Sequence, residues 1–262
     1  MTDAPLLQVR DLTRRYKLPR QSLLRRAPVL TALEGGAFTL NAGETLGVVG
    51  ESGSGKSTLA RLIMAFERPD EGQVLFRGRD LHSLPAQDLR ALRRGFQMVF
   101  QDPFGSLNPR RIIGWSIAEP LRASGEGTAI AQRVAEALEQ VGLHPAEASK
   151  YPHEFSGGQR QRIAIARAII TRPALLVADE AVSALDVSVQ AQILNLLMDL
   201  QDDLGLGLVF ISHDLAVVAS ICDRVMVLQH GKKLESGPAA DVLRSPEHPY
   251  TKTLLKAAGA RP

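Results

Sequence analysis

The sequence of 262 residues predicts an α/β fold built on a mostly parallel sheet. Short apolar segments of strand length alternate with segments of helical periodicity, a pattern typical of parallel strands covered by helices. A glycine-rich loop lies between one such strand and a helix, and polar side chains directly follow several other strands. Because ligands bind at the carboxyl ends of strands in open parallel sheets, these features predict a single site.

The composition excludes several classes of protein. Hydrophobic residues make up 45% of the chain, enough for one substantial core with or without an attached lobe. A net charge of +3 is too small a basic excess to indicate nucleic-acid binding. The single Cys222, predicted to be buried, rules out an internal disulfide and a four-cysteine metal site. No apolar run is long enough to span a membrane and the first residues lack a secretory signal, so we expect a cytoplasmic protein.

The first part of the chain contains two predicted strands, residues 6–9 and 37–40, on either side of a basic stretch. We expect this stretch, from Arg14 to Arg26, to be a solvated loop, because Pro19 and Pro28 break regular structure.

Residues 50–58 fit the phosphate-binding loop pattern G-x-x-x-x-G-K-[ST], and an apolar strand is predicted at residues 45–49. A helix is predicted next from apolar residues that recur on one face: Leu59, Leu62, Ile63 and Phe66. Glycines let successive N–H groups turn toward a phosphate, and the helix N-terminus adds partial positive charge. Lys56 is expected to reach the β- and γ-phosphates and Ser57 to hold Mg²⁺. The predicted nucleotide-binding residues are Gly50, Glu51, Ser52, Gly53, Ser54, Gly55, Lys56, Ser57 and Thr58.

The rest of the chain supplies five more predicted strands and a helical insertion. Residues 112–154 have helical and more polar periodicity, which predicts a lobe inserted between strands of the core. Two further helices are predicted at residues 160–170 and 192–200. The strands are predicted at residues 72–78, 97–100, 174–178, 206–211 and 224–229.

Polar residues directly follow three of these strands, and phosphoryl-transfer chemistry suggests their roles. Asp179 fits the acid that holds the Mg²⁺ shell. Because successive side chains of a strand point to opposite faces, Glu180 is expected to point away from that metal position and is the natural general base for an attacking water. Gln101 can bind the metal or orient water, and His213 can sense the γ-phosphate. For Tyr16 two interpretations stay open: a ring stacked on a purine and a packed strand tyrosine.

A second glycine segment opens the helix at residues 160–170 and is again an anion-binding design. It consists of Ser156, Gly157, Gly158 and Gln159. A second anion site is unexpected in a chain that acts alone.

The set and order of these motifs resemble those of the ATP-binding subunit of ABC transporters. Residues 156–159 resemble the signature motif, with Phe155 where many members have Leu, and Ala181 stands where many have Pro. Gln101 resembles the Q-loop glutamine, His213 the switch histidine and Tyr16 the adenine-stacking aromatic. The segment that resembles the D-loop of the family consists of Ser183, Ala184, Leu185 and Asp186.

The resemblance implies a P-loop NTPase core with an N-terminal antiparallel β subdomain and an inserted α-helical subdomain. It places an ABC transporter ATP-binding domain at residues 6–256, the helical subdomain at about residues 104–158 and a short tail at residues 257–262. It also implies that two such subunits dimerise head to tail, so that the signature of each closes over the ATP held by the other. The implied partners are a related second ATP-binding subunit, two membrane permeases and an extracytoplasmic solute-binding protein. The implied location is the cytoplasmic face of the inner membrane.

Three segments are similar to the second ATPase of dipeptide, oligopeptide and nickel uptake systems: residues 100–110, 183–194 and 248–251. We therefore expect an ATPase that drives peptide uptake, with nickel or another small solute as the alternative substrate. Two readings from other classes are a stand-alone ATPase acting on nucleic acid and a non-catalytic nucleotide-binding regulator. An ATPase acting on nucleic acid would need a stronger basic face than this sequence offers. A non-catalytic regulator would be expected to lack the general base, but Glu180 and His213 are both present.

Overall fold

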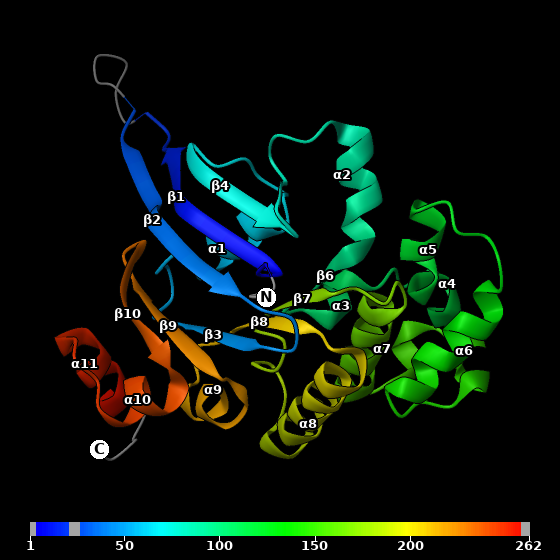
Figure 1. Cartoon of the computed structure of the whole chain (residues 1–262). Helices are drawn as coiled ribbons and strands as arrows, with labels where there is room; N and C mark the ends of the chain where they lie inside the picture. Colours follow the sequence, from blue (N-terminus) through cyan, green and yellow to red (C-terminus); the bar gives the residue numbers. More distant parts are fainter. Residues whose placement is uncertain (1–3, 21–26, 258–262) are drawn as a thin grey trace. The chain divides into compact units, whose positions relative to one another are not determined.

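The computed structural model describes residues 4–20 and 27–257, which fold as two compact units. The first unit comprises Met1–Leu84 and Phe210–Pro262, and the second comprises Pro85–Val209. Figure 1 labels most of the helices and strands of both. None of the described helices is long and apolar enough to cross a membrane.

The first unit contains the predicted antiparallel β subdomain. Strand β1 (Leu7–Lys17) pairs antiparallel with both β2 (Val29–Leu40) and β4 (Glu71–Phe76). The short β5 (Arg79–Asp80) continues this sheet beside β4. Burial alternates at the start of β1, where Leu7 and Val9 are buried, as expected for a sheet with one face on the core. The alternation breaks at the register shift between Val9 and Leu12, after which Leu12 and Thr13 are both buried.

The prediction of a solvated loop from Arg14 to Arg26 was wrong for its first part. β1 continues through Lys17, and Tyr16 pairs with Leu30 of β2. The cross-strand pairing and ion pairs from Arg14 to Glu67 and Asp70 compensate for the high charge of this segment. The last part, which includes Arg25 and Arg26, lies outside the described residues.

The phosphate loop follows a parallel strand of the first unit. β3 (Thr45–Val49) is buried throughout and pairs in parallel with β9 (Arg224–Gln229), which pairs antiparallel with β10 (Lys232–Pro238). Within this unit the strands follow the order β5-β4-β1-β2-β10-β9-β3.

Among its described residues the first unit has four helices: α1 (Lys56–Ile63), α9 (Leu215–Ile221), α10 (Ala239–Arg244) and α11 (Pro249–Ala257). Helix α1 ends sooner than predicted, and Phe66 lies beyond it with 47% of its surface exposed. The helix ends because Ala65 adopts a positive φ of 50°. The burial of Cys222 was predicted, and the structure shows it only partly buried, just after α9.

The second unit contains the parallel pair β6 (Phe96–Val99) and β7 (Leu175–Asp179), with Phe96 opposite Leu175. Helix α7 (Gly157–Ile169) packs on β6 and is surrounded by other helices of this unit. These are α3 (Pro103–Ser106), α4 (Ile113–Ile117), α5 (Glu119–Ala123), α6 (Ile130–Gln140) and α8 (Val187–Leu204). The remaining helix is α2 (Ala86–Leu92), followed by short 3₁₀ turns at Arg93–Gly95, Pro145–Ser149 and Pro152–Glu154.

Strand β8 (Gly207–Ile211) is the segment at which the two units meet in sequence. Its first residue, Gly207, donates its N–H to the Ala174 carbonyl in the second unit. In the first unit, Ser212 at the end of this strand donates its N–H to the Val48 carbonyl of β3. The five strands predicted after the phosphate loop are all present as β4, β6, β7, β8 and β9, within about one or two residues of the expected bounds.

Candidate nucleotide-binding and catalytic site

The phosphate loop joins the buried strand β3 to helix α1, as the sequence predicted. Lys56 is 5% exposed, and its ammonium group donates to the carbonyls of Gly50 at 2.6 Å and Glu51 at 2.9 Å. A buried ammonium at the start of a helix places positive charge where backbone N–H groups also point. This end of β3 therefore suits a polyphosphate.

Two glycines of the loop cannot be replaced without moving backbone. A Cβ on Gly50, at a φ of 153°, would lie 2.2 Å from the Leu228 carbonyl oxygen. A Cβ on Gly55, at a φ of 106°, would lie 2.4 Å from the Ala32 carbonyl oxygen. The loop thus packs tightly on β9 and β2.

Two hydroxyl groups in this loop have different environments. The buried Ser54 hydroxyl has no hydrogen-bond partner among the described residues, whereas the Ser57 side chain at the start of α1 is exposed. A buried polar group without a partner is costly unless a ligand satisfies it. The loop therefore fits a phosphate group, and Ser57 is accessible for Mg²⁺.

His213 belongs to the first unit, follows the end of β8 and is exposed. Its neighbours in sequence, Ser212 and Asp214, are both held by hydrogen bonds. Ser212 Oγ accepts from the Asp214 N–H at 3.0 Å, and Asp214 caps α9 by accepting from Ala216 and Val217. Because Ser212 is hydrogen-bonded to Val48, His213 leaves its strand beside the end of β3 that leads into the phosphate loop. The structure therefore brings His213 and the phosphate loop to neighbouring strand ends.

Tyr16 lies on β1 and is half-buried. Its hydroxyl donates to Glu67 Oε2 at 2.6 Å, and the Arg14 guanidinium lies 4.8 Å from the centre of its ring. The ring is thus held in place, and its stacking on a purine stays a prediction.

In the second unit, the ends of the paired strands β6 and β7 bring Gln101 and Glu180 together. Gln101 Nε2 donates to Glu180 Oε2 at 3.1 Å and lies 3.3 Å from Ser183 Oγ. The Ser183 hydroxyl in turn donates to the Glu180 backbone carbonyl at 3.0 Å. This interaction of the glutamine with the glutamate was not anticipated from the sequence.

The backbone at the end of β7 is unusual. Glu180 has a φ of +49°, in the left-handed region that residues other than glycine seldom adopt. Such conformations cluster at functional sites, where the surrounding structure maintains them. Asp179, one residue earlier, has a carboxylate oxygen that is buried from solvent. The Glu180 carboxylate, by contrast, is hydrogen-bonded to Gln101. The roles of Asp179 as a metal ligand and Glu180 as the general base stay predictions.

The glycine segment 156–159 forms the N-terminus of α7. Ser156 Oγ accepts from the Gln159 N–H at 3.3 Å, and Gln159 Oε1 accepts from the Ser156 N–H at 2.9 Å, which is a capping box. A Cβ on Gly158 would lie 2.4 Å from Val189 Cγ1 of α8, whereas one on Gly157 would come no closer than 3.9 Å to Leu185. Gly158 is therefore required for packing within this chain, while Gly157 is not.

The segment 183–186 leads from the glutamate into α8. Asp186 caps that helix, because its Oδ1 accepts from the Val189 N–H at 2.9 Å and the Ser188 hydroxyl at 2.7 Å. These hydrogen bonds hold the pKa of Asp186 below its ordinary value. Ser183, Ala184 and Asp186 are exposed, and Leu185 is partly exposed.

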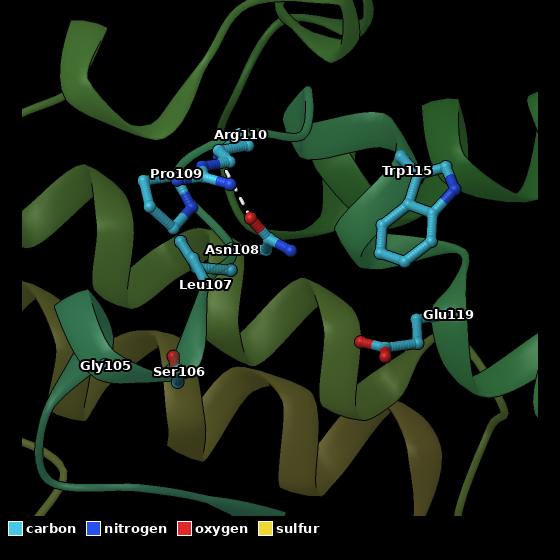
Figure 2. A pocket seen from close by; sticks show the side chains of 8 residues that line it. All are labelled: Gly105, Ser106, Leu107, Asn108, Pro109, Arg110, Trp115 and Glu119. Carbon is cyan, nitrogen blue, oxygen red and sulfur yellow. Dashed lines mark hydrogen bonds between the residues drawn. The ribbon is translucent and has the colours of Figure 1, made fainter.

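The second unit also has an open groove of about 650 Å³ after α3 (Figure 2). Arg167 of α7 donates to the Ser106 carbonyl at its edge, and burial lowers the Arg167 pKa despite the nearby Glu119. The groove is lined by Gly105, Ser106, Leu107, Asn108, Pro109, Arg110, Trp115 and Glu119.

A strand, a glycine loop with a buried lysine and a helix start together define a P-loop nucleotide-binding protein. The sequence model of the family described as ABC transporter matches residues 33–183, more than half of the chain, so the chain belongs to the ABC transporter family.

Relatives with similar sequences indicate which branch of the ABC transporter family this chain resembles. The chain is 53% identical to the probable peptide ABC transporter ATP-binding protein y4tS of Sinorhizobium fredii, covering 98% of this chain and 73% of that protein. It is 51% identical to the glutathione import ATP-binding protein GsiA of Salmonella typhimurium, over 97% of this chain but only 41% of that relative. The chain thus spans less than half the length of the latter. These names confirm the resemblance to the peptide-importer branch.

Solved structures confirm the predicted fold. An ATP-binding cassette determined as a dimer in a post-hydrolysis state with ADP and phosphate is 28% identical, with a TM-score of 0.78. That match covers 89% of this chain and 98% of the solved one. The cbiO1 protein from Clostridium perfringens, part of the ABC transporter complex cbiONQ, is 26% identical over 98% of this chain and 95% of its own, with a TM-score of 0.78.

One contact of the phosphate loop could not be found from the sequence. Tyr250 of α11 lies against Glu51, although 199 positions separate them in the sequence. The only signal was the motif at residues 248–251, which indicated a branch of the family and no contact.

Proposed function

We propose that this chain is the ATP-hydrolysing subunit of an ABC importer that takes up dipeptides or oligopeptides. The observation that supports it most directly is the hydrogen bond from Gln101 to Glu180, which holds a carboxylate at the end of a buried strand. The peptide-import names of the relatives support the substrate class. Nickel or another small solute is the alternative substrate, and nucleic acid is not expected to be one.

In this proposal Lys56 binds the β- and γ-phosphates of ATP through its ammonium charge, and the loop N–H groups surround them. The Ser57 hydroxyl and the Asp179 carboxylate, with Gln101, provide oxygen ligands of the kind that Mg²⁺ prefers. Bound Mg²⁺ neutralises charge on the phosphates. Tyr16 stacks on the adenine.

Glu180 is the proposed general base, which accepts a proton from the attacking water at its carboxylate. Gln101 keeps that carboxylate oriented through its 3.1 Å hydrogen bond. The base is therefore already in position before water attacks, which lowers the entropic cost of the reaction. His213 is proposed to respond to the γ-phosphate. Each of these roles is supported by residue type, by position after a strand and by the family's motif order.

The segment Ser156–Gln159 is proposed to bind the ATP held by a second ATP-binding subunit, together with Ser183–Asp186. The exposed side chains at Ser183 and Ser156 support this, since both are accessible to a partner. We propose a related, non-identical subunit as that partner.

The further proposed partners are two membrane permeases and an extracytoplasmic solute-binding protein, which place the chain at the cytoplasmic face of the inner membrane. The helical subdomain at about residues 104–158 is the part proposed to contact the permeases. The domain limits, residues 6–256 with a tail at 257–262, belong to the same proposal, and residues 258–262 lie outside the described structure.

Purification of the tagged chain from detergent-solubilised membranes of its own host tests this assembly. We expect a second ATP-binding subunit and two permeases to copurify, and the complex to hydrolyse ATP. Recovery of the chain only as a monomer with full ATPase activity would contradict the proposal. Binding of RNA or DNA at physiological salt would favour the nucleic-acid alternative.

A further inference from the structure

The C-terminal helix of the first unit contacts the phosphate loop. Tyr250, in the first turn of α11, is 9% exposed, and its hydroxyl oxygen accepts a hydrogen bond from the backbone N–H of Glu51 at 3.2 Å. Glu51 is the second residue of the phosphate loop. Both residues belong to the same compact unit.

The Glu51 peptide groups are held from two sides. While Tyr250 engages the N–H, the Glu51 carbonyl accepts from the Lys56 ammonium at 2.9 Å and from the Ser54 N–H at 3.1 Å. A shift of the Glu51 backbone would therefore alter the position of Lys56, the residue proposed to bind phosphate. The loop is also anchored by the Gly231 N–H, which donates to the Ser54 carbonyl at 3.0 Å.

The start of α11 is itself fixed to strand β10 through one carboxylate. Glu235 of β10 accepts from the N–H groups of Glu247 at 2.8 Å and His248 at 3.2 Å. His248 Nδ1 accepts from the Tyr250 N–H at 3.1 Å, and the neighbouring Thr251 is fully buried. The start of α11, which carries the tyrosine, is thus hydrogen-bonded to strand β10 through Glu235.

We propose that Tyr250 is a positioning residue that holds the phosphate loop in its ATP-binding conformation, which makes the C-terminal helix part of the nucleotide site. This rests on the proposed function of the phosphate loop as an ATP site. The motif at residues 248–251 then acts on ATP binding within its own subunit, whichever solute the transporter carries.

Removal of the hydroxyl leaves the Glu51 N–H without its protein acceptor while the ring still fills its place. A net hydrogen bond of this kind corresponds to roughly a three- to tenfold change in an equilibrium constant. The loop would then occupy other conformations, and ATP would bind more weakly by that factor. The chemical step should change little, because Tyr250 touches no reacting atom.

The test compares Tyr250→Phe with wild type in the full-length chain, with Tyr151→Phe as the matched control. Tyr151 is an exposed tyrosine of the second unit, so the same atom is removed away from Glu51. We expect the Kd for ATP to rise about three- to tenfold in Tyr250→Phe and to stay unchanged in Tyr151→Phe. In the assembled transporter the KM for ATP should rise by a similar factor with kcat within about twofold.

A second measurement distinguishes positioning from general destabilisation. Amide hydrogen exchange at Glu51 without nucleotide should accelerate in Tyr250→Phe, while exchange in β3 and β9 stays at the wild-type rate. Equal Kd and equal Glu51 exchange in both proteins would overturn the inference and leave the proposed function intact. Failure of the wild-type chain itself to bind ATP would instead contradict the proposed function.

Discussion

Gln101 Nε2 lies 3.1 Å from Glu180 Oε2, so the glutamine after β6 donates directly to the carboxylate after β7. The parallel register of these strands, with Val99 opposite Ala178, produces this meeting. Glu180 also has a left-handed backbone, which the Ser183 hydroxyl stabilises at the Glu180 carbonyl. A carboxylate oriented by an amide donor is well suited to accept a proton from water.

Replacement of Glu180 by Gln should therefore abolish most hydrolysis while keeping ATP bound. The amide still accepts from Gln101 but is no longer a base, so turnover should fall about 10²–10⁴-fold. ATP affinity should stay near the wild-type value. With its proposed partner subunit and Mg²⁺, the variant should accumulate as a closed dimer in gel filtration with ATP. Turnover at the wild-type rate would move the base elsewhere, with His213 as the next candidate.

The two signature glycines predict different outcomes for the same substitution. Gly158→Asp introduces a Cβ 2.4 Å from Val189 Cγ1, and overpacking of this kind costs about 1–3 kcal/mol of unfolding free energy. Gly157→Asp has room and should keep the wild-type melting temperature. It should bind ATP normally in the isolated chain but fail in ATP-dependent dimerisation, because its carboxylate would repel the partner's phosphates.

Gly157→Asn provides the uncharged control for this test. If Asn and Asp variants dimerise equally well, repulsion by charge is not the cause. If Gly157→Asp weakens ATP binding by the isolated chain, the segment acts on its own subunit's nucleotide.

Lys56→Ala should remove ATP binding, since the ammonium is the only fixed side-chain charge assigned to the phosphates. The wild-type Lys56 is buried and bonded to Gly50 and Glu51, so a small loss of stability without nucleotide is also expected. Lys150→Ala, which removes an exposed lysine of the second unit, is the matched control and should bind ATP normally. Calorimetric ATP titration of the folded variants is the measurement. ATP affinity in Lys56→Ala equal to that of the control would contradict the assigned role.

Glu235 predicts a pH dependence of the C-terminal helix. Burial raises the Glu235 pKa, but the nearby Thr251 hydroxyl and the hydrogen bonds from the N–H groups of Glu247 and His248 outweigh it and lower the pKa below the ordinary 4.5. A lowered folded-state pKa means that the stabilisation is present above pH 4.5 and is lost as pH falls through the folded value. The melting temperatures of wild type and Glu235→Gln should therefore differ at pH 6 and converge as the pH falls through the lowered folded-state pKa of Glu235. A constant difference across this range would exclude ionisation of Glu235 as the cause.

Much of the architecture could be predicted because it depends on local sequence. The apolar runs that became β3, β7 and β9 contain few polar residues, and the glycine pattern of the phosphate loop has a single well-known geometry. The helix after Ser156 was predicted at residues 160–170, and the structure begins it at Gly157 with Ser156 in a capping box. Local patterns of this kind carry enough information without tertiary contacts.

The errors arose where distant contacts decide the structure. Arg14 looks like a loop residue until Glu67 is known to lie beside it, and Phe66 looks like a core residue until the helix is seen to end at Ile63. The same limit applies to the site. The sequence predicted that Gln101 and Glu180 follow strands, but only the register of β6 on β7 shows that one donates to the other.

The most direct test of the central claim is peptide uptake by the reconstituted importer with ATP enclosed on the side of this chain. Proteoliposomes containing the permeases, the second ATP-binding subunit and the wild-type chain should accumulate a labelled dipeptide or tripeptide delivered by the solute-binding protein. With Glu180→Gln in place of the wild-type chain, uptake should fall at least as far as ATP hydrolysis, about 10²-fold or more. Peptide uptake that proceeds equally with either chain, or without enclosed ATP, would contradict the account.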